Sequence, residues 1–225
     1  MKFDIEFAIS KLPHFASYIG MTLKISVLAM IFTLVLSILF SLIRYSKIPV
    51  LTPIINGYID FFRGTPLLTQ LFFIYYGLPQ IIPAFKTLPA IVAAVAGLSL
   101  NAAAYTTENI RSALEAVPHG QTEGGLSVGL TNLQVMRYIV LPQATRIAIP
   151  VLSNDFIALV KNSSMAFTLG VRELMAEVQL IGNVNFKFFE GYLDAMILYF
   201  LLCKVINIAQ KRLERYYAKK GGTIK

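Results

Sequence analysis

The stretch that decides the fold is TEGGLSVGLTNLQVMRYIVLPQA, from Thr122 to Ala144. It is polar and rich in glycine, and it stands in a chain that is otherwise strongly apolar. A nucleotide-binding loop would continue after its last glycine with a lysine and then a serine or threonine. Here Gly129 is followed by the residues LTN, which excludes such a loop. The glycines instead indicate a surface where a partner approaches closely.

The composition around this stretch is that of a membrane protein. Of the 225 residues, 56% are hydrophobic and 14% are charged, whereas soluble domains carry about 25% charge. The single Cys203 excludes an intrachain disulfide and a multi-cysteine metal site. His14 and His119 are far apart and have no cysteine or carboxylate pattern around them. We therefore expect no metal and no cofactor in this chain.

Long uncharged runs predict where the chain crosses the membrane. We expect five spans in a single domain of residues 1–225, at about residues 19–43, 58–83, 88–113, 140–169 and 191–210. A span needs about 20 predominantly apolar residues. Pro66, Pro79 and Pro83 predict that the second span is kinked or ends early. Asp4 and Glu6 argue against a cleavable signal at the N-terminus.

The distribution of basic residues predicts the orientation in the membrane. With the N-terminus outside, twelve of the twenty Lys and Arg residues fall in inner segments and five in outer segments. We therefore expect an outside N-terminus and a cytoplasmic C-terminus. The basic tail KRLERYYAKK, residues 211–220, then lies beside anionic lipid rather than nucleic acid. The opening stretch belongs to a cytoplasmic loop over about residues 115–142, between the third and fourth spans.

The opening stretch resembles the cytoplasmic EAA loop of ATP-binding-cassette (ABC) import permeases. That pattern reads E-A-A, three residues, G, nine residues, I-x-L-P. The chain has EGG at 123–125, a glycine at 129 and IVLP at 139–142, and it departs from the pattern in having Gly-Gly for Ala-Ala. The resemblance implies that coupling to a partner ATPase involves Glu123, Gly124, Gly125, Gly129, Ile139, Leu141 and Pro142.

Three further motifs resemble the polar amino-acid permeases of this superfamily. They are FRGTPLLTQLFFIYYGLP at 62–79, NAAAYTTENIRSAL at 101–114 and LVKNSSMAFTLGVRELM at 159–175. The resemblance implies an all-α, polytopic permease of the type I importer fold in the bacterial inner membrane, and not an enzyme. It also implies a second permease subunit, identical or paralogous, two ABC ATPase subunits that bind ATP and Mg²⁺, and an extracytoplasmic amino-acid-binding protein.

Polar side chains within the spans are the candidates for substrate binding, because such residues face the bundle interior or a cavity. They are Thr65, Gln70, Asn101, Tyr105, Glu108, Asp155, Lys161, Asn162 and Ser163. Lys161 is expected to meet the carboxylate of a zwitterionic amino acid. Alternatively, Lys161 pairs with Asp155 or with an acid of another helix and holds the bundle together.

Three of these candidates share one face of the third span. Asn101, Tyr105 and Glu108 fall at i, i+4 and i+7. The pattern leaves two outcomes open, because the three side chains can face a substrate path or form hydrogen bonds between helices, and Glu108 can pair with Arg111. Arg63 is expected to extend its side chain to the inner surface of the membrane.

Within the family, the second-span and fourth-span motifs resemble cystine-type permeases most closely. Import of arginine, histidine, lysine or glutamine stays open as an alternative. A channel or scaffold subunit without ATP coupling is the alternative from a different functional class. A membrane enzyme is not supported, because the sequence has no nucleophile–base pair and no metal cluster.

Overall fold

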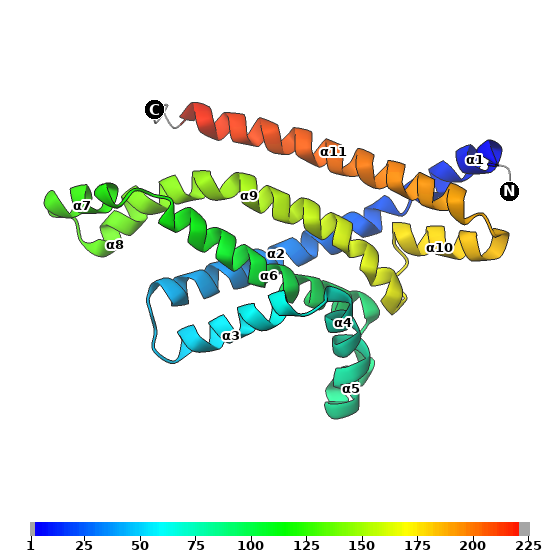
Figure 1. Cartoon of the computed structure of the whole chain (residues 1–225), viewed down its shortest axis with the longest axis horizontal. Helices are drawn as coiled ribbons and strands as arrows, with labels where there is room; N and C mark the ends of the chain where they lie inside the picture. Colours follow the sequence, from blue (N-terminus) through cyan, green and yellow to red (C-terminus); the bar gives the residue numbers. More distant parts are fainter. Residues whose placement is uncertain (1–2, 221–225) are drawn as a thin grey trace.

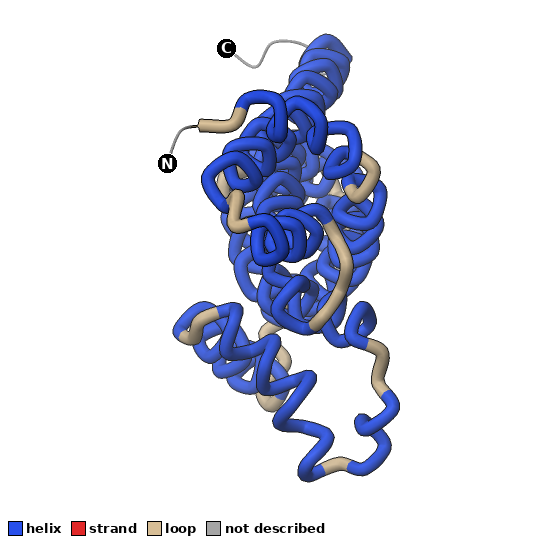
Figure 2. The backbone as a smooth tube through the Cα atoms, turned by 90° about the vertical axis from the view of Figure 1, so that its right-hand side faces the viewer, coloured by secondary structure: helices blue, strands red, loops and turns tan. Residues whose placement is uncertain are grey.

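The computed structural model describes residues 3–220, and this part consists of helices and loops without a strand (Figures 1 and 2). The side chains of residues 213 and 216–220 are not described, so the structure tests the expected basic tail, residues 211–220, only in part. The helices are α1 (Ile5–Ala16), α2 (Ile19–Tyr45), α3 (Leu51–Gly64), α4 (Leu67–Phe72), α5 (Leu78–Ile81), α6 (Ala90–Glu115), α7 (His119–Ser127), α8 (Asn132–Val135), α9 (Leu141–Asn162), α10 (Leu174–Asn185) and α11 (Phe188–Lys220). The all-α prediction is confirmed for this part of the chain.

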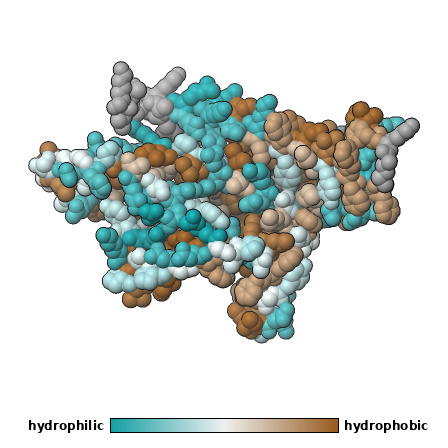
Figure 3. Space-filling model, viewed as in Figure 1, coloured by the Kyte–Doolittle hydropathy of each residue, from teal (hydrophilic) through white to brown (hydrophobic). Residues whose placement is uncertain are grey.

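The long helices α2, α6, α9 and α11 form an elongated bundle (Figure 1). Helices α7 and α8 lie at one end of it, and α1 and α10 lie at the other end beside the N-terminus. Helices α3, α4 and α5 flank the bundle on one side. Hydrophilic residues gather over the middle of the face seen in Figure 3, so this face is not uniformly suited to lipid.

Three of the described helices are long and apolar enough to cross a membrane, by length and composition: α2, α6 and the Phe188–Arg212 part of α11. The count of five spans stays a prediction. The segment expected as a second span, 58–83, is not one helix, because α3 ends at Gly64 and α4 begins at Leu67. The segment expected over 140–169 consists of α9 followed by a 3-10 segment, Ser163–Leu169.

The break between α3 and α4 has a clear cause in Pro66. Proline has no N–H, so it cannot bond the carbonyl four residues earlier, that of Phe62. Two buried amides use this carbonyl instead: Gln70 donates its Nε2–H at 3.0 Å and Asn101 donates its Nδ2–H at 3.3 Å. In a membrane a freed backbone group needs such a partner. The two amides therefore stabilise the break and fix it against α6.

A row of small and hydroxyl side chains joins α2 to α6. Thr33 donates to the Ser99 carbonyl at 3.4 Å, and Ser41 donates to the Thr107 carbonyl at 3.3 Å. Both pairs are 66 positions apart in the sequence, so the two helices run parallel. Small residues allow membrane helices to approach closely, and hydroxyl–carbonyl bonds then add to the packing. This row forms the centre of the bundle.

At the end that carries α1 and α10, a carboxylate joins three elements. Glu177 of α10 lies 2.9 Å from Nε2 of His14 on α1 and 2.7 Å from Nη2 of Arg172. Burial alone would raise the pKa of Glu177, but the hydrogen bonds from His14 and Arg172 outweigh it and lower that pKa. The cluster therefore attaches α1 to the bundle.

A larger side chain in the α2–α6 contact tests how much this contact contributes to the stability of the protein. Ser37 is fully buried and its hydroxyl points at the carbonyls of Thr33 and Ala103. We expect Ser37→Leu to destabilise the protein by about 1–3 kcal/mol, because overpacking separates the helices. The matched control is Val35→Leu on the exposed side of the same helix, where Val35 is 60% exposed. Thermal unfolding of the detergent-solubilised protein measures both, and equal effects would contradict this account of the bundle centre.

Candidate functional site

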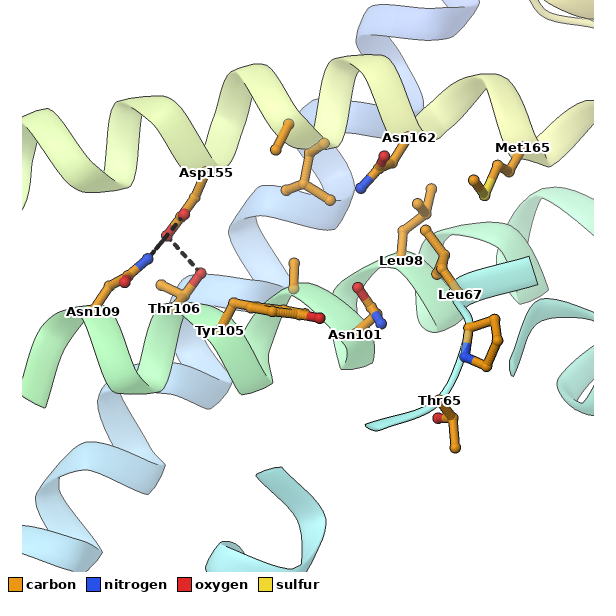
Figure 4. Close-up of a pocket in the computed structure, with 14 residues that line it drawn as sticks. Thr65, Leu67, Leu98, Asn101, Tyr105, Thr106, Asn109, Asp155, Asn162 and Met165 are labelled. Atoms are coloured by element: carbon orange, nitrogen blue, oxygen red, sulfur yellow. Dashed lines mark hydrogen bonds between the residues drawn. The ribbon is translucent and has the colours of Figure 1, made fainter. Parts of the chain in front are cut away.

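A pocket of about 470 Å³ opens between α6, α9 and the α3–α4 break (Figure 4). The described residues that line it are Thr65, Pro66, Leu67, Leu98, Asn101, Ala102, Tyr105, Thr106, Asn109, Asp155, Ala158, Leu159, Asn162 and Met165. Its walls combine apolar side chains with a few amides and hydroxyls, as small-molecule sites usually do. Its volume falls within the usual range for such sites.

Asp155 is the one charged side chain among the described residues that line the pocket. Its carboxylate accepts hydrogen bonds from the Thr106 hydroxyl at 2.9 Å and from the Asn109 amide at 2.9 and 3.0 Å. Both donors are neutral and lie on α6, as Figure 4 shows. A carboxylate has about four acceptor positions. Asp155 therefore has no cationic partner among the described residues that line the pocket and can accept a further hydrogen bond.

The opposite end of the pocket is built on the helix break. Gln70 donates to the carbonyl and to the hydroxyl of Thr65, at 3.1 and 2.7 Å, and accepts from Asn101 at 3.0 Å. This network holds Thr65 and Pro66 against α6, where they form a wall of the pocket. Gln70 itself is buried and does not line the pocket, so it acts as a positioning residue.

The structure brings together about half of the substrate-binding candidates expected from the sequence. Those that line the pocket are Thr65, Asn101, Tyr105, Asp155 and Asn162. Gln70 supports the wall, as described above. Three others lie elsewhere among the described residues: Glu108, Lys161 and Ser163.

Each of these three has a different environment. Glu108 forms ion pairs with Arg44 and, at 2.9 Å, with Arg111, so the pairing alternative describes it correctly. Ser163 is fully buried and donates to a backbone carbonyl of its own helix. Lys161 is exposed and forms no ion pair among the described residues, so the alternative in which it pairs with Asp155 or with an acid of another helix is not found there. Its expected contact with the substrate carboxylate stays a prediction.

Sequence reasoning missed Thr106, Asn109 and Met165. Thr106 and Asn109 continue the face of α6 that carries Asn101 and Tyr105, at i+5 and i+8 from Asn101. The helical spacing of these polar residues is therefore visible in the sequence, but the expected polar face of the third span included Glu108 in place of Asn109. Met165 lies in the 3-10 segment after α9, whose backbone geometry the sequence pattern did not indicate.

The segment expected as a cytoplasmic loop, about residues 115–142, folds as α7, α8 and a π turn, Met136–Val140, ahead of α9. It has a small apolar core of its own around Val117, Val135, Val140 and Ala144. Thr131 and Gln134 form a reciprocal capping box that starts α8. The segment is therefore an ordered unit and not a flexible connection.

The glycines of this loop have different roles. Gly125 is buried, and a Cβ placed on it would lie 2.7 Å from Cδ1 of Ile139 and 2.8 Å from Cγ2 of Val135. A Cβ on Gly124 would meet nothing within 4 Å. The Gly-Gly that replaces Ala-Ala is thus explained at position 125 by close packing, whereas nothing in the structure requires a glycine at position 124.

Gly129 ends α7 with a Schellman motif. Its φ is +85°, which favours glycine. The N–H of Leu130 bonds the Gly125 carbonyl at 3.2 Å, and the N–H of Gly129 bonds the Leu126 carbonyl at 3.0 Å, which is the bonding pattern of that motif. The spacing between Gly125 and Gly129 therefore sets where the short helix ends and the direction in which the chain leaves it.

The arrangement of a helical bundle, a polar pocket and an ordered unit of α7 and α8 can be compared with known proteins. Residues 46–219 match the family described as the inner membrane component of binding-protein-dependent transport systems. This chain belongs to that family. The permease is 44% identical to a probable amino-acid ABC transporter permease, PatM, of Vibrio harveyi, over 97% of this chain and all of that protein.

Other relatives are named for different amino acids. The L-cystine transport system permease TcyB of Bacillus subtilis is 38% identical over 92% of this chain and 89% of that protein. The arginine transport system permease ArtQ of the same organism is 33% identical over 96% of this chain and 97% of that protein. This permease is thus a subunit of an amino-acid ABC importer, and the expected family is confirmed.

A solved structure agrees with this assignment. The permease superposes on a chain of the crystal structure of an amino acid ABC transporter with histidines, with a TM-score of 0.89 and 33% identity over 96% of this chain and all of that chain. The type I importer fold expected from the motifs is confirmed.

Two alanine substitutions test the packing of the cytoplasmic loop. We expect Gly125→Ala to displace α7, because its Cβ would overlap Val135 and Ile139, and overpacking costs about 1–3 kcal/mol. We expect Gly124→Ala, its matched control, to be neutral or to stabilise α7 by up to about 1 kcal/mol. Limited proteolysis of the loop measures both, with faster cleavage for Gly125→Ala alone. Equal cleavage of the two variants would contradict the close packing at Gly125.

Proposed function

We propose that this permease forms half of the membrane pathway of an ATP-driven importer of polar amino acids. The observation that supports this proposal most directly is the position of the cytoplasmic loop in the chain. Helix α6 lines the pocket with residues 98–109 and ends at Glu115, just before α7. Helix α9 starts at Leu141, just after the loop, and lines the pocket with residues 155–162. A displacement of the loop would therefore act on both walls of the pocket.

The loop offers a surface suited to an ATPase partner. Several of its apolar side chains are exposed at the end of the bundle: Leu126, Val128, Leu133, Tyr138 and Leu141. Glu123 is exposed on α7 beside them. In this proposal α7 sits in a groove of a separate ATPase, which binds ATP and Mg²⁺ and whose closure moves α6 and α9. The Schellman motif at Gly129 and the packed Gly125 keep α7 rigid enough to transmit that movement.

The assembly would contain two permease subunits, identical or paralogous, two ATPases and an extracytoplasmic binding protein. The N-terminus would lie outside and the C-terminus in the cytoplasm of a bacterium, as the basic residues predict. The substrate would be cystine, with arginine, histidine, lysine or glutamine as alternatives. Cystine is preferred because the motifs of the second and fourth expected spans resemble those of cystine-type permeases, and because the sequence is 38% identical to a cystine permease.

Asp155 is bonded to neutral donors alone among the described residues, which supports a role in binding the ammonium group of the substrate. A hydrogen bond to a charged group contributes about 1.5–3 kcal/mol. We therefore expect Asp155→Asn to reduce uptake at least about tenfold while the complex still assembles. Reconstitution with the neighbouring ATPase and binding protein, followed by uptake of labelled cystine, arginine, histidine, lysine and glutamine, measures this effect.

The same reconstitution distinguishes the importer from a channel or scaffold subunit. The importer requires ATP for uptake, and it loses uptake when Glu123 and Gly129 are disrupted. Flux that is independent of ATP, or uptake that is unchanged by those disruptions, would contradict the proposed function. Assembly is checked by size-exclusion chromatography, so that a folding defect is not taken for a loss of transport.

A further inference from the structure

An ion pair joins the last turn of α2 to the C-terminal half of α6. Arg44, the penultimate residue of α2, donates from Nη1 to Oε1 of Glu108 on α6. The two side chains are largely buried, at 19% and 20% exposed. Arg111 also binds Glu108 at 2.9 Å, and it donates to Glu115 one turn further along α6 at 2.5 Å. Glu108 is therefore held on two sides, and the pair belongs to a network of charges.

The hydroxyl contacts between α2 and α6 repeat along both helices. Each hydroxyl donates to one carbonyl: Thr33 to that of Ser99, Ser37 to that of Ala103 and Ser41 to that of Thr107. Both sets are spaced by four residues, and the side chains at the three α6 positions are small and buried. A shift of one helix by four residues, about 6 Å, would offer each hydroxyl the next carbonyl in the row. The hydroxyl row alone therefore does not define the register of the two helices.

The ion pair does not repeat in this way. One turn before and one turn after Glu108, the residues of α6 are Ala104 and Ser112, and neither carries a charge. A shift of one turn would therefore separate Arg44 from Glu108. Separating a largely buried pair is strongly unfavourable, because each charge is left without its partner. Fixing the register of two helices is a known use of buried polar and ionic groups.

The loop of α7 and α8 is attached to the same part of α6. Helix α6 ends at Glu115 and leads into α7 (Figure 1). Leu114, in the last turn of α6, packs against the apolar core of the loop. Glu108 lies seven residues before the end of α6, which is about two turns. A displacement of the loop would therefore act on α6 close to the ion pair.

We propose that the Arg44–Glu108 ion pair fixes the register of α2 on α6 and thereby makes α2 move with α6 when the loop is displaced. The part of this inference that concerns movement rests on the proposed function. Arg44 and Glu108 are positioning residues, because neither is among the described residues that line the pocket. Helix α2 likewise contributes no described residue to the pocket, so it acts on transport through α6, which forms a wall of it.

Disulfide cross-linking in the reconstituted importer measures the register. Ser37→Cys is combined in turn with Ala103→Cys, at the facing position, and with Ser99→Cys or Thr107→Cys, one turn to either side. We expect the chain with Arg44 to cross-link mainly to position 103. Arg44→Gln should move part of the cross-linking to positions 99 and 107, a shift of about 6 Å along the helix. Arg44→Lys keeps the charge and should keep most of the cross-linking at position 103.

Uptake of labelled amino acids and ATP hydrolysis are measured for the same substitutions of Arg44. We expect Arg44→Gln to lower the amount imported per ATP hydrolysed, because α2 no longer follows α6. Arg111→Gln is the matched control, since the two acids that Arg111 binds lie on its own helix. It should change neither the register nor this ratio. The cross-linking variants carry Cys203→Ser to remove the native thiol, and size-exclusion chromatography checks assembly.

The other outcomes overturn the proposal in distinguishable ways. Cross-linking that stays at position 103 in Arg44→Gln, or that spreads equally in Arg111→Gln, would overturn the register role of the ion pair. A changed register with an unchanged ratio of uptake to ATP hydrolysis would overturn its role in movement. A wild-type complex that imports no amino acid would contradict the proposed function, while the cross-linking would still decide the register.

Discussion

The parallel contact between α2 and α6 is the interaction on which the rest of this permease depends. Its hydroxyl side chains bond the carbonyls of the facing helix, with Thr33 opposite Ser99 and Ser41 opposite Thr107. Small residues let the two backbones approach, and in a bilayer close packing replaces the hydrophobic effect as the source of stability. Helix α6 is thereby held in one position, and it presents its other faces to α3, α4 and α9.

Helix α6 connects the pocket with the loop that carries α7 and α8, the two regions that the proposed transport function uses. Near the middle of α6, Asn101 joins Gln70 in satisfying the carbonyl that Pro66 leaves free, and the break they stabilise forms a wall of the pocket. Towards its C-terminal end, α6 continues to Glu115 and leads into α7. The same helix thus positions the pocket and carries the loop. In the proposed coupling no further element has to transmit the movement, because α6 and α9 flank the loop and also line the pocket.

Much of the fold followed from the sequence, because membrane helices and the loop motif leave strong local patterns. The spacing from Glu123 to Pro142 indicated the segment that folds as α7 and α8, and uncharged runs located α2 and α6. The helix break at Pro66 was anticipated as a kink in the second span. The sequence did not indicate which groups bond the freed carbonyl of Phe62, because Gln70 and Asn101 come together only through tertiary packing. The reason for Gly125 also lies in tertiary packing, in its contact with Val135 and Ile139.

The pocket was harder to predict, because geometry rather than residue type decides which polar side chains line it. Asp155 and Lys161 both lie in α9, and only the structure shows that Asp155 lines the pocket whereas Lys161 is exposed. In the proposed mechanism, amino acids bind between α6 and α9. We expect a cryo-electron microscopy structure of the complete importer with its amino acid to place the ligand ammonium within about 3 Å of the Asp155 carboxylate. A ligand bound elsewhere in the membrane would overturn the proposed mechanism.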